Sequence, residues 1–406
     1  MESINTIETL KFFKDFKRKL LKKGHSNSTE CAIETSRLFH DVIRYSIENN
    51  EIKTQSELIL LVRHLGKKLI AIDQVQFCIG NIIKRILYII REEINKNSIS
   101  KNDFEFDENI LNEDLKTSIK NLQAKKLQNL EYFETKKPES ESFEKNIESD
   151  DSESEGKSKN SSSSNNLLNN KPITQDNKDK ILNNIDELIN ELEFIDENII
   201  NQANEYISDN DVILTSNKSQ ILIQFFSEVA KTKKFKVFIT ESAPSLEGIT
   251  QAEILVQKGV DTTVISDNSV YGIMPKITKV IIGTKAIMVN GGLISYNGVY
   301  NVCLCAKVFL IPVIVVGGTS KITPVYSFRH QKFNEYLSPS KIFDVKYESD
   351  ISNFRFNIPA YDYIPPEFIT IYITNIGSQN PAYIYRIFSE MYSQEDYLFD
   401  SEEDHK

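Results

Sequence analysis

The spacing of apolar residues changes near residue 209 of this 406-residue sequence, and this change constrains the fold most. Before that point, apolar side chains recur every three or four residues, which places an apolar stripe along one side of a helix. The stripe is clearest at Ile79, Ile82, Ile83, Ile86, Leu87 and Ile90. Beyond residue 209 the apolar residues gather in short β-branched runs. The chain is therefore predicted to join a helical domain to a sheet domain.

The predicted strands are short and apolar on both sides, and most are separated by amphipathic stretches. They cover residues 212–215, 236–240, 262–266, 279–284, 313–316 and 369–374. Such strands alternating with helices are typical of a parallel sheet covered on both faces, with right-handed crossovers. We therefore predict an α/β fold in which an amino-terminal helical domain precedes a Rossmann-like, mostly parallel sheet domain over residues 209–392.

The helical pattern is interrupted by a low-complexity segment. Residues 139–155 hold eight acidic residues and one Lys, and residues 160–170 read NSSSSNNLLNN. A segment of this composition cannot bury enough apolar area to offset its chain entropy. We therefore predict a first helical part over residues 1–96 and a disordered insert over residues 97–177.

Helical order returns over residues 178–208, which we predict to complete the helical domain. Its apolar residues form a seam in steps of four and three: Ile181, Ile185, Leu188, Leu192, Ile195 and Ile199. A seam of this spacing can pack in a coiled coil with a partner chain. Packing on the chain's own earlier helices is favoured, because the seam is short and those helices also need a cover.

The net charge of −10 comes from two segments. Residues 139–155 contribute −7, residues 395–406 contribute −5, and the remaining residues sum to about +2. We assign residues 393–406 to an acidic tail. A nearly neutral folded part argues against direct nucleic-acid binding, which needs clustered basic residues. The sequence has neither a signal peptide nor a membrane span, so we expect a cytosolic protein.

No motif in the sequence predicts a cofactor or a metal. Cys31, Cys78, Cys303 and Cys305 form no Cys-x-x-Cys pair, so free thiols are expected. The run 317-GGTSK-321 lacks the upstream Gly of a phosphate-binding loop. Asn290, Gly291 and Gly292 are expected to form a turn with positive φ.

Several longer runs carry a resemblance to a known family. The most specific are 281-IIGTKAIMVNGG-292, 361-YDYIPPE-367 and 374-TNIGSQNPAYIYR-386. With residues 71–93 and the surrounding sheet segments, they resemble the beta subunits of eukaryotic translation initiation factor 2B, the guanine nucleotide exchange factor of initiation factor 2. The resemblance covers nearly the whole chain outside the insert and the extreme ends.

The resemblance implies a fold shared with sugar-phosphate isomerases, and it allows their activity to be tested residue by residue. Those enzymes move a proton with a Cys after the first strand and an Asp in a Gly-Ala-Asp motif. Here Asn217 and Lys285 stand at these positions, and Ala243 replaces a phosphate-binding Arg. A neutral amide and an ammonium group cannot replace that acid and base pair. We therefore expect no catalytic residues.

What remains is expected to be a vestigial pocket formed by Asn217, Asp267, Asn268, Lys285 and Asn290. Asp267 and Asn268 match an Asp-Asn step of the enzymes, although for Asp267 a cap on the following helix is favoured over a ligand role. Isomerisation of ribose 1,5-bisphosphate or methylthioribose 1-phosphate remains the alternative function. A stand-alone homo-oligomeric binding protein is a further alternative.

The resemblance implies a non-catalytic regulatory subunit that works by differential binding. Its implied partners are the alpha, gamma, delta and epsilon subunits of initiation factor 2B, with beta pairing to delta through the sheet domains. The helical domains of alpha, beta and delta are implied to sense the phosphorylated alpha subunit of initiation factor 2.

Two surfaces are candidates for these contacts. The first is rich in Tyr, Asn and Arg, as interfaces often are, and comprises Tyr372, Asn375, Asn380, Tyr383, Tyr385 and Arg386. Core packing with a turn at Asn380 is its alternative explanation. The second is a basic strip of Lys84, Arg85 and Arg91, for which ordinary solvated charge is the alternative.

Overall fold

The computed structural model describes residues 11–22, 27–49, 52, 54–73, 76–99, 175–325, 334–342 and 355–397. The chain divides into two compact units, Met1–Glu93 with Asn169–Lys406 and Ile94–Leu168. Nearly all of the second unit lies outside the described residues, and so do residues 100–174 of the predicted insert; residues 97–99 and 175–177, predicted to belong to the insert, are helical instead. The helices that flank it end at Ile99 and begin at Gln175.

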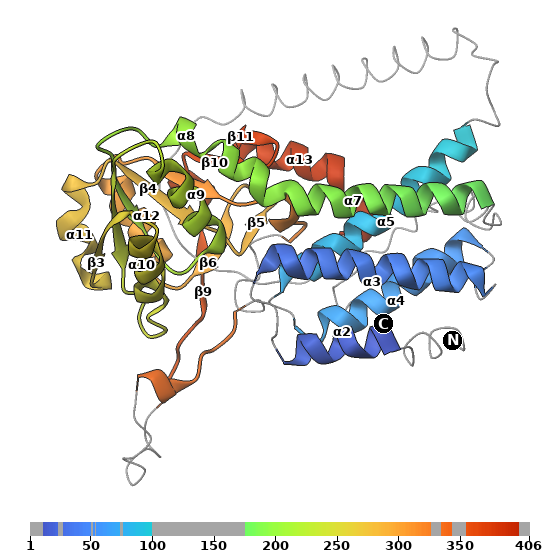
Figure 1. Cartoon of the computed structure of the whole chain (residues 1–406). Coiled ribbons are helices and arrows are strands. Elements are labelled where there is room, and N and C mark those ends of the chain that lie inside the picture. Colours follow the sequence, from blue (N-terminus) through green and yellow to red (C-terminus); the bar gives the residue numbers. More distant parts are fainter. Residues whose placement is uncertain are drawn as a thin grey trace, which may run out of the picture. The chain divides into compact units, whose positions relative to one another are not determined.

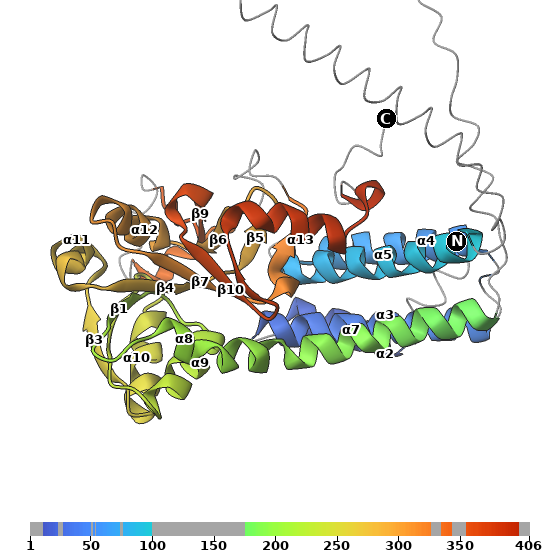
Figure 2. The ribbon, with the colours of Figure 1, turned by 90° about the horizontal axis from the view of Figure 1, so that it is seen from above.

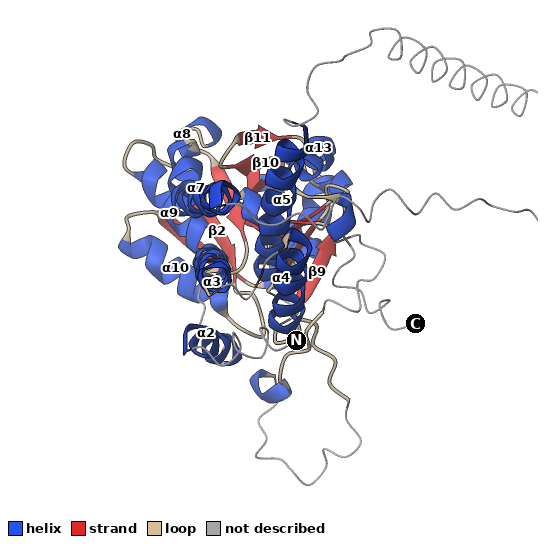
Figure 3. Ribbon diagram, turned by 90° about the vertical axis from the view of Figure 1, so that its right-hand side faces the viewer, coloured by secondary structure: helices blue, strands red, loops and turns tan. Residues whose placement is uncertain are grey.

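The helices that precede the strands run from blue through cyan to green in Figure 1, and Figure 3 shows them almost end-on in front of the sheet. They are α2 (Lys11–Leu21), α3 (Ser28–Glu48), α4 (Gln55–Ile70), α5 (Phe77–Ile99) and α7 (Gln175–Asn201). Asn27 caps α3 by accepting a hydrogen bond from the Thr29 amide, and Thr54 and Glu57 form a capping box on α4.

The seam of α7 packs inside the chain. All six of its predicted apolar residues are buried, and α7 lies along α3. At the borders of this contact, Thr29 donates to Asp196 and Arg37 pairs with Glu193. Packing on the chain's own helices is thus confirmed.

The larger sheet has the strand order β11-β10-β7-β4-β1-β2-β3 and is parallel except at β11. Its strands are β1 (Val212–Thr215), β2 (Lys236–Thr240), β3 (Asp261–Ile265), β4 (Lys279–Gly283), β7 (Val313–Val316), β10 (Ile371–Thr374) and β11 (Gly377–Gln379). The predicted parallel sheet is confirmed. The prediction that every strand is apolar on both sides is wrong for β3, where Asp261, Thr263 and Val264 are exposed because it is an edge strand.

Helices cover both faces of this sheet (Figure 2). The chain passes through α8 (Ala203–Tyr206), α9 (Gln220–Ala230), α10 (Glu247–Gln257), α11 (Val270–Ile273), α12 (Val299–Val308) and α13 (Ile384–Met391). In Figure 2, α9 and α10 lie on one side of the strands and α12 on the other. This is the doubly wound arrangement that alternating strands and helices predict.

A second, four-stranded sheet was not predicted. Its order is β8-β5-β6-β9, with β5 (Ala286–Met288), β6 (Leu293–Tyr296), β8 (Ile322–Thr323) and β9 (Tyr361–Ile364). Its strands have two to four residues each, too few for a periodic pattern. Gly291 has φ +78° in the turn between β5 and β6, which confirms the positive φ expected there.

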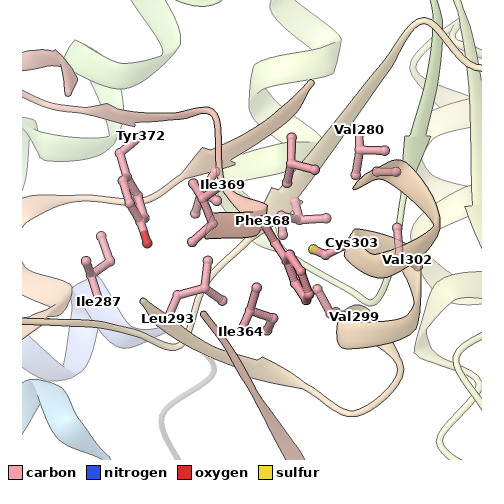
Figure 4. Packing of buried hydrophobic residues seen from close by; sticks show 14 of the residues in the cluster. Val280, Ile287, Leu293, Val299, Val302, Cys303, Ile364, Phe368, Ile369 and Tyr372 are labelled. Atoms are coloured by element: carbon pink, nitrogen blue, oxygen red, sulfur yellow. The ribbon is translucent and has the colours of Figure 1, made fainter. Parts of the chain in front are cut away.

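The two sheets share one apolar core (Figure 4). Ile287 and Leu293 from the smaller sheet pack with Val280 and Tyr372 from the larger one. The Tyr372 hydroxyl donates a hydrogen bond of 2.8 Å to the carbonyl oxygen of Gly291. Because this bond satisfies its polar end, Tyr372 can be completely buried.

Two further sequence expectations can be compared with the described residues. All four cysteines are free thiols, as predicted, and Cys31, Cys78 and Cys303 are buried. Among the described helices, none is both long enough and apolar enough to cross a membrane.

Candidate functional site

A pocket lies at the carboxyl edge of the parallel sheet, where ligands bind in folds of this class. Its floor comes from the ends of β1, β4 and β7: Ser216, Asn217, Gly283, Thr284, Lys285, Gly317 and Gly318. The amino-terminal turns of α9 and α3 and Asp196 of α7 also line it. We call it the edge pocket.

Asn217 is held by local hydrogen bonds. Its backbone is left-handed, with φ +60°, a conformation that Asn tolerates better than most residues. Its amide N–H donates to Ser242 Oγ at 3.0 Å, and its side-chain Nδ2 donates to Ser216 Oγ at 3.0 Å. The Asn217 side chain therefore serves to shape the turn before α9.

Two lysines line the edge pocket, and each donates a hydrogen bond to another group of the chain. Lys285 Nζ donates to Gln76 Oε1, which precedes α5. Lys321 Nζ donates to the Thr284 carbonyl oxygen at 2.8 Å. Burial lowers the pKa of Lys321 to about 8, with Asp196 acting to raise it and Lys285 to lower it. The sheet edge is thus cationic near neutral pH, and Lys285 ties it to the helical part.

The edge pocket is small. Its cavity volume is about 80 Å³, whereas pockets for small organic ligands typically have about 300–1,000 Å³. This space suits a few water molecules or one small ion rather than a pentose bisphosphate.

The edge pocket contains Asn217 and Lys285 but not the other three residues predicted for it. The carboxylate of Asp267 accepts hydrogen bonds from the amides of Ser242 (3.1 Å) and Ala243 (2.8 Å). It therefore holds the loop after β2, and the expectation that it caps the following helix is wrong. Asn268 is exposed beside it.

Asn290 is exposed in the turn between β5 and β6. Its Oδ1 accepts from the Gly292 amide at 3.0 Å, and its Nδ2 donates to Tyr363 Oη at 2.8 Å. The prediction that Asn290 lies in the pocket was wrong. Asn290 belongs to a turn of the smaller sheet, which was not predicted, and this turn lies away from the carboxyl edge of the parallel sheet.

Sequence reasoning missed Lys321 and Asp196 as lining residues. The signal for Lys321 was the run 317-GGTSK-321, which was considered only as a phosphate loop. Its glycines have a packing role, because a Cβ on Gly318 would lie 2.5 Å from Ile195 Cγ2 of α7. Asp196 offered no local signal, since only the packing of α7 brings it to the sheet edge.

The first interface candidate divides into buried and exposed residues. Tyr372 is a core residue, so its assignment to a surface was wrong. Asn375 Oδ1 accepts from the Thr319 amide at 2.9 Å, and Asn380 forms the expected turn by accepting from the Ala382 amide. Tyr383 and Tyr385 are each 58% exposed.

The predicted basic strip is not a solvated surface. Lys84 is only 2% exposed, and Arg85 pairs with Glu191 of α7 at 2.5 Å. Arg91 binds Asp396 with 2.8 Å between Nε and Oδ2. The strip was misassigned because α7 and the carboxy-terminal segment cover the side of α5 that was predicted to face solvent.

Asp396 is a site residue that the sequence did not indicate. It ends a short 3-10 helix (Gln394–Asp396) in the predicted acidic tail and is 1% exposed. Its carboxylate accepts hydrogen bonds from Arg63 of α4 and Arg91 of α5. This buried ion cluster attaches the segment after α13 to two helices of the helical part.

Comparison with known proteins gives a consistent set of relatives. A model of the initiation factor 2 subunit family matches residues 25–381. Translation initiation factor eIF2B subunit beta of Dictyostelium discoideum is 33% identical over 367 residues, which cover 90% of this chain and 92% of that protein.

Solved structures agree on the fold. The crystal structure of eIF2B beta from Chaetomium thermophilum has a TM-score of 0.64 at 20% identity and covers 97% of both chains. The tetrameric eIF2B-beta2-delta2 complex from C. thermophilum gives 0.60 at 20% identity, covering 96% of this chain and 99% of that one. For eIF2B delta from C. thermophilum the TM-score is 0.57 at 17% identity, covering 91% of this chain and 98% of that one.

Proposed function

The chain belongs to the initiation factor 2 subunit family, and we propose that it is the beta-type regulatory subunit of translation initiation factor 2B, the exchange factor of initiation factor 2. The observation that carries this proposal is the 33% identity to a beta subunit over 90% of the chain. Agreement over such a length includes both the helical part and the sheet domain. We place the subunit in the cytosol, where translation initiates.

We further propose that the chain has no isomerase activity of its own. Asn217 and Lys285, at the positions assigned to the enzymes' Cys and Asp, are engaged in hydrogen bonds with the chain itself. The edge pocket is also small for a sugar bisphosphate. Titration calorimetry with ribose 1,5-bisphosphate and methylthioribose 1-phosphate should give no binding heat, and turnover of either compound would contradict the proposal.

The proposed partners are the alpha, gamma, delta and epsilon subunits, and the alpha subunit of initiation factor 2. In this assignment the chain contributes binding surfaces, and a partner held in one pose supports exchange while another pose blocks it. The described helices α2, α3, α4, α5 and α7 are the part to which we assign the sensing of phosphorylated initiation factor 2.

Purification from the source cells tests the assignment. The chain is tagged at its own locus, isolated at physiological salt and analysed by mass spectrometry. Four companion subunits in equal amounts are expected. Recovery of the chain alone, or as a homo-oligomer without companions, would contradict the proposal.

A further inference from the structure

Two of the four cysteines lie together where helices α3 and α5 begin. Cys31 is in the first turn of α3, and Cys78 is in the first turn of α5. Cys31 is 0% and Cys78 is 4% exposed, and their two thiols share a hydrogen bond. The spacing of the cysteines in the sequence does not indicate this pair, because α4 and its flanking loops separate the two positions.

Both helix ends are fixed to one short segment of the sheet domain, the 3-10 helix Thr319–Lys321 that follows β7. Helix α3 contacts this segment. Helix α5 is bound to it by Asn81, whose Nδ2 donates to the Ser320 carbonyl oxygen at 3.0 Å. The first residue of α5, Phe77, is also buried against the smaller sheet. These contacts place the two thiols side by side.

The two thiols differ in acidity. The hydrogen bond from Cys31 lowers the pKa of Cys78, and the nearby charges of Lys285 and Lys321 lower it further, although burial acts to raise it. The pKa of Cys31 is raised by the same hydrogen bond and by burial. Cys78 is thus the sulfur that loses its proton first, and the thiolate is the form of cysteine that reacts with oxidants.

The edge pocket gives a small oxidant an approach to the pair. Lys321 lines this pocket, together with Ser28 and Thr29, which precede Cys31 on α3. The cavity volume of about 80 Å³ exceeds what one water molecule needs. Hydrogen peroxide, which is little larger than water, therefore fits in the pocket, whereas a bulky thiol reagent such as glutathione does not.

Cys303 and Cys305 of α12 differ from this pair. They are two residues apart on one helix, so their side chains point to different sides. Burial and the charge of Asp362 raise the pKa of Cys303 to about 12, and burial raises the pKa of Cys305. Both therefore stay in the less reactive thiol form near neutral pH, and they serve as controls within the same chain.

We propose that Cys31 and Cys78 are a redox-sensitive pair, which hydrogen peroxide converts to a reversible disulfide that joins α3 to α5 at the sheet edge. In the first step, the Cys78 thiolate attacks one oxygen of the peroxide. The O–O bond breaks, the attacked oxygen stays on sulfur as a sulfenic acid, and the other oxygen leaves as hydroxide, which takes a proton from solvent.

In the second step, the Cys31 sulfur attacks the Cys78 sulfur. The S–O bond breaks, and the hydroxide leaves as water with the proton of the Cys31 thiol. Each sulfur loses one electron, and the peroxide is reduced to water. Because the two thiols are already hydrogen-bonded neighbours, small side-chain movements are enough to bring the sulfurs into bonding distance.

The disulfide would stabilise the helical part of the chain. It would close a loop that contains all of α4, and a cross-link that closes a long loop restricts the unfolded chain most. It would also connect α3 and α5 directly, in addition to their contacts with the sheet domain. The pair therefore couples the stability of the helical part to the oxidation state of its surroundings.

Peptide mapping of the full chain tests the proposal. The reduced, folded chain is exposed to hydrogen peroxide, the remaining thiols are alkylated in denaturant, and the peptides are identified by mass spectrometry. We expect a linked pair of peptides that joins Cys31 to Cys78, lacks two hydrogens and is separated by dithiothreitol. This link should form at least about tenfold faster than Cys303 or Cys305 is oxidised. The oxidised chain should melt at least about 5 °C higher than the reduced chain.

Single variants assign the roles of the two sulfurs. In Cys31→Ala the Cys78 sulfenic acid has no partner and should be trapped by dimedone, whereas Cys78→Ala should leave Cys31 at least about tenfold less reactive towards peroxide. Cys305→Ala is the matched control, and its link between Cys31 and Cys78 should form within about twofold of the rate in the unmodified chain. The peptide map of the unmodified chain does not depend on any of these variants.

Three results would overturn the inference. They are recovery of both cysteines as thiols after peroxide treatment of the folded chain, separate oxidation of each without a link, and a link that forms only when the chain is unfolded in urea. In each case the assignment to the exchange factor would be unaffected, because these measurements use the isolated chain and involve no partner.

Discussion

The edge pocket and the outer side of α12 differ in where their contacts are made. At the edge pocket, Asn217, Lys285 and Lys321 all bind groups of the chain itself. At the outer side of α12, large apolar side chains such as Leu304 and Val308 remain exposed although their helix is fully packed on its other side. Residue types alone suggest the opposite, because polar residues at a sheet edge resemble a ligand site and apolar residues on a helix resemble a core.

The difference bears on what each of the two regions can bind. A small pocket whose cations are bound internally has little capacity to hold and activate a substrate. A neutral apolar surface, in contrast, gains free energy only when another molecule covers it. Substitutions can distinguish contacts made within the chain from contacts made with another molecule, and the largest expected effect comes first.

The internal contact whose loss should destabilise the chain most is the ion pairing of Asp396 with Arg63 and Arg91. We expect Asp396→Ala to lower the free energy of unfolding of the chain by about 3–5 kcal/mol, because Arg63 and Arg91 would lose a buried shared carboxylate. Urea unfolding measures the change. Glu390→Ala, which breaks the exposed pair with Arg386, should cost less than about 0.5 kcal/mol. Equal effects of the two variants would contradict a buried role for Asp396.

Lys321 should make stability depend on pH. Its pKa is lowered from 10.5 to about 8 in the folded chain, so the unfolded chain binds more protons between these values. The free energy of unfolding should therefore rise with pH through this window, by about 3 kcal/mol, and the destabilisation caused by Lys321 should be constant below pH 8. The neighbouring groups are Asp196, Lys285 and Cys78.

Lys321→Met supplies the comparison for that experiment. The difference in unfolding free energy between the variant and the unmodified chain gives the contribution of Lys321 alone, since the other titrating groups are common to both. The variant should be the more stable at pH 7, and its advantage should shrink by about 3 kcal/mol towards pH 10.5. A difference that does not vary with pH would refute the lowered pKa.

Paired substitutions on α12 compare its two sides directly. Val302→Ala should lower the free energy of unfolding by about 1.5 kcal/mol, because two buried methyl groups are lost. Val308→Ala, six residues further along the helix and exposed, should change it by less than about 0.5 kcal/mol. Thermal or urea unfolding of the isolated chain gives both values, and a comparable loss for Val308→Ala would show that its side is already covered.

The smallest expected effects on folding belong to Tyr383 and Arg386. We expect Tyr383→Ala and Arg386→Glu each to change the free energy of unfolding by less than about 0.5 kcal/mol, because both side chains are exposed. Each should weaken binding of the delta-type subunit while the chain stays folded. Unchanged co-purification with that subunit would remove these two residues from the interface candidates.

The periodic elements could be predicted from the sequence because their signal is local. The six strands of the parallel sheet and the buried seam of α7 follow from side-chain spacing alone. The smaller sheet could not be predicted this way, because its strands are held by pairing between distant residues, such as Ile294 with Tyr363. Asn290 was misplaced for the same reason.

The candidate sites were harder to predict than the strands and helices, because they depend on which distant residues pack together and not on the local spacing of side chains. Asn217 and Lys285 meet in one pocket because each follows a neighbouring parallel strand, and this is a consequence of sheet order. Lys84, Arg91 and Tyr372 have the composition of a surface but are buried or paired inside the chain. The sequence around Arg91 does not distinguish an arginine exposed to solvent from one that forms an ion pair with Asp396.

The amino-acid sequence by itself determined the order of helical and sheet parts, the mostly parallel topology and the family resemblance, since these depend on residue spacing and on long runs that resemble the family. Only the tertiary structure decided that the pocket's lysines bind the chain itself, that Asp396 is buried between two arginines and that the outer side of α12 is exposed among the described residues. Burial and charge pairing are properties of residues brought together from distant positions, and hydrophobic and electrostatic free energies depend on those neighbours.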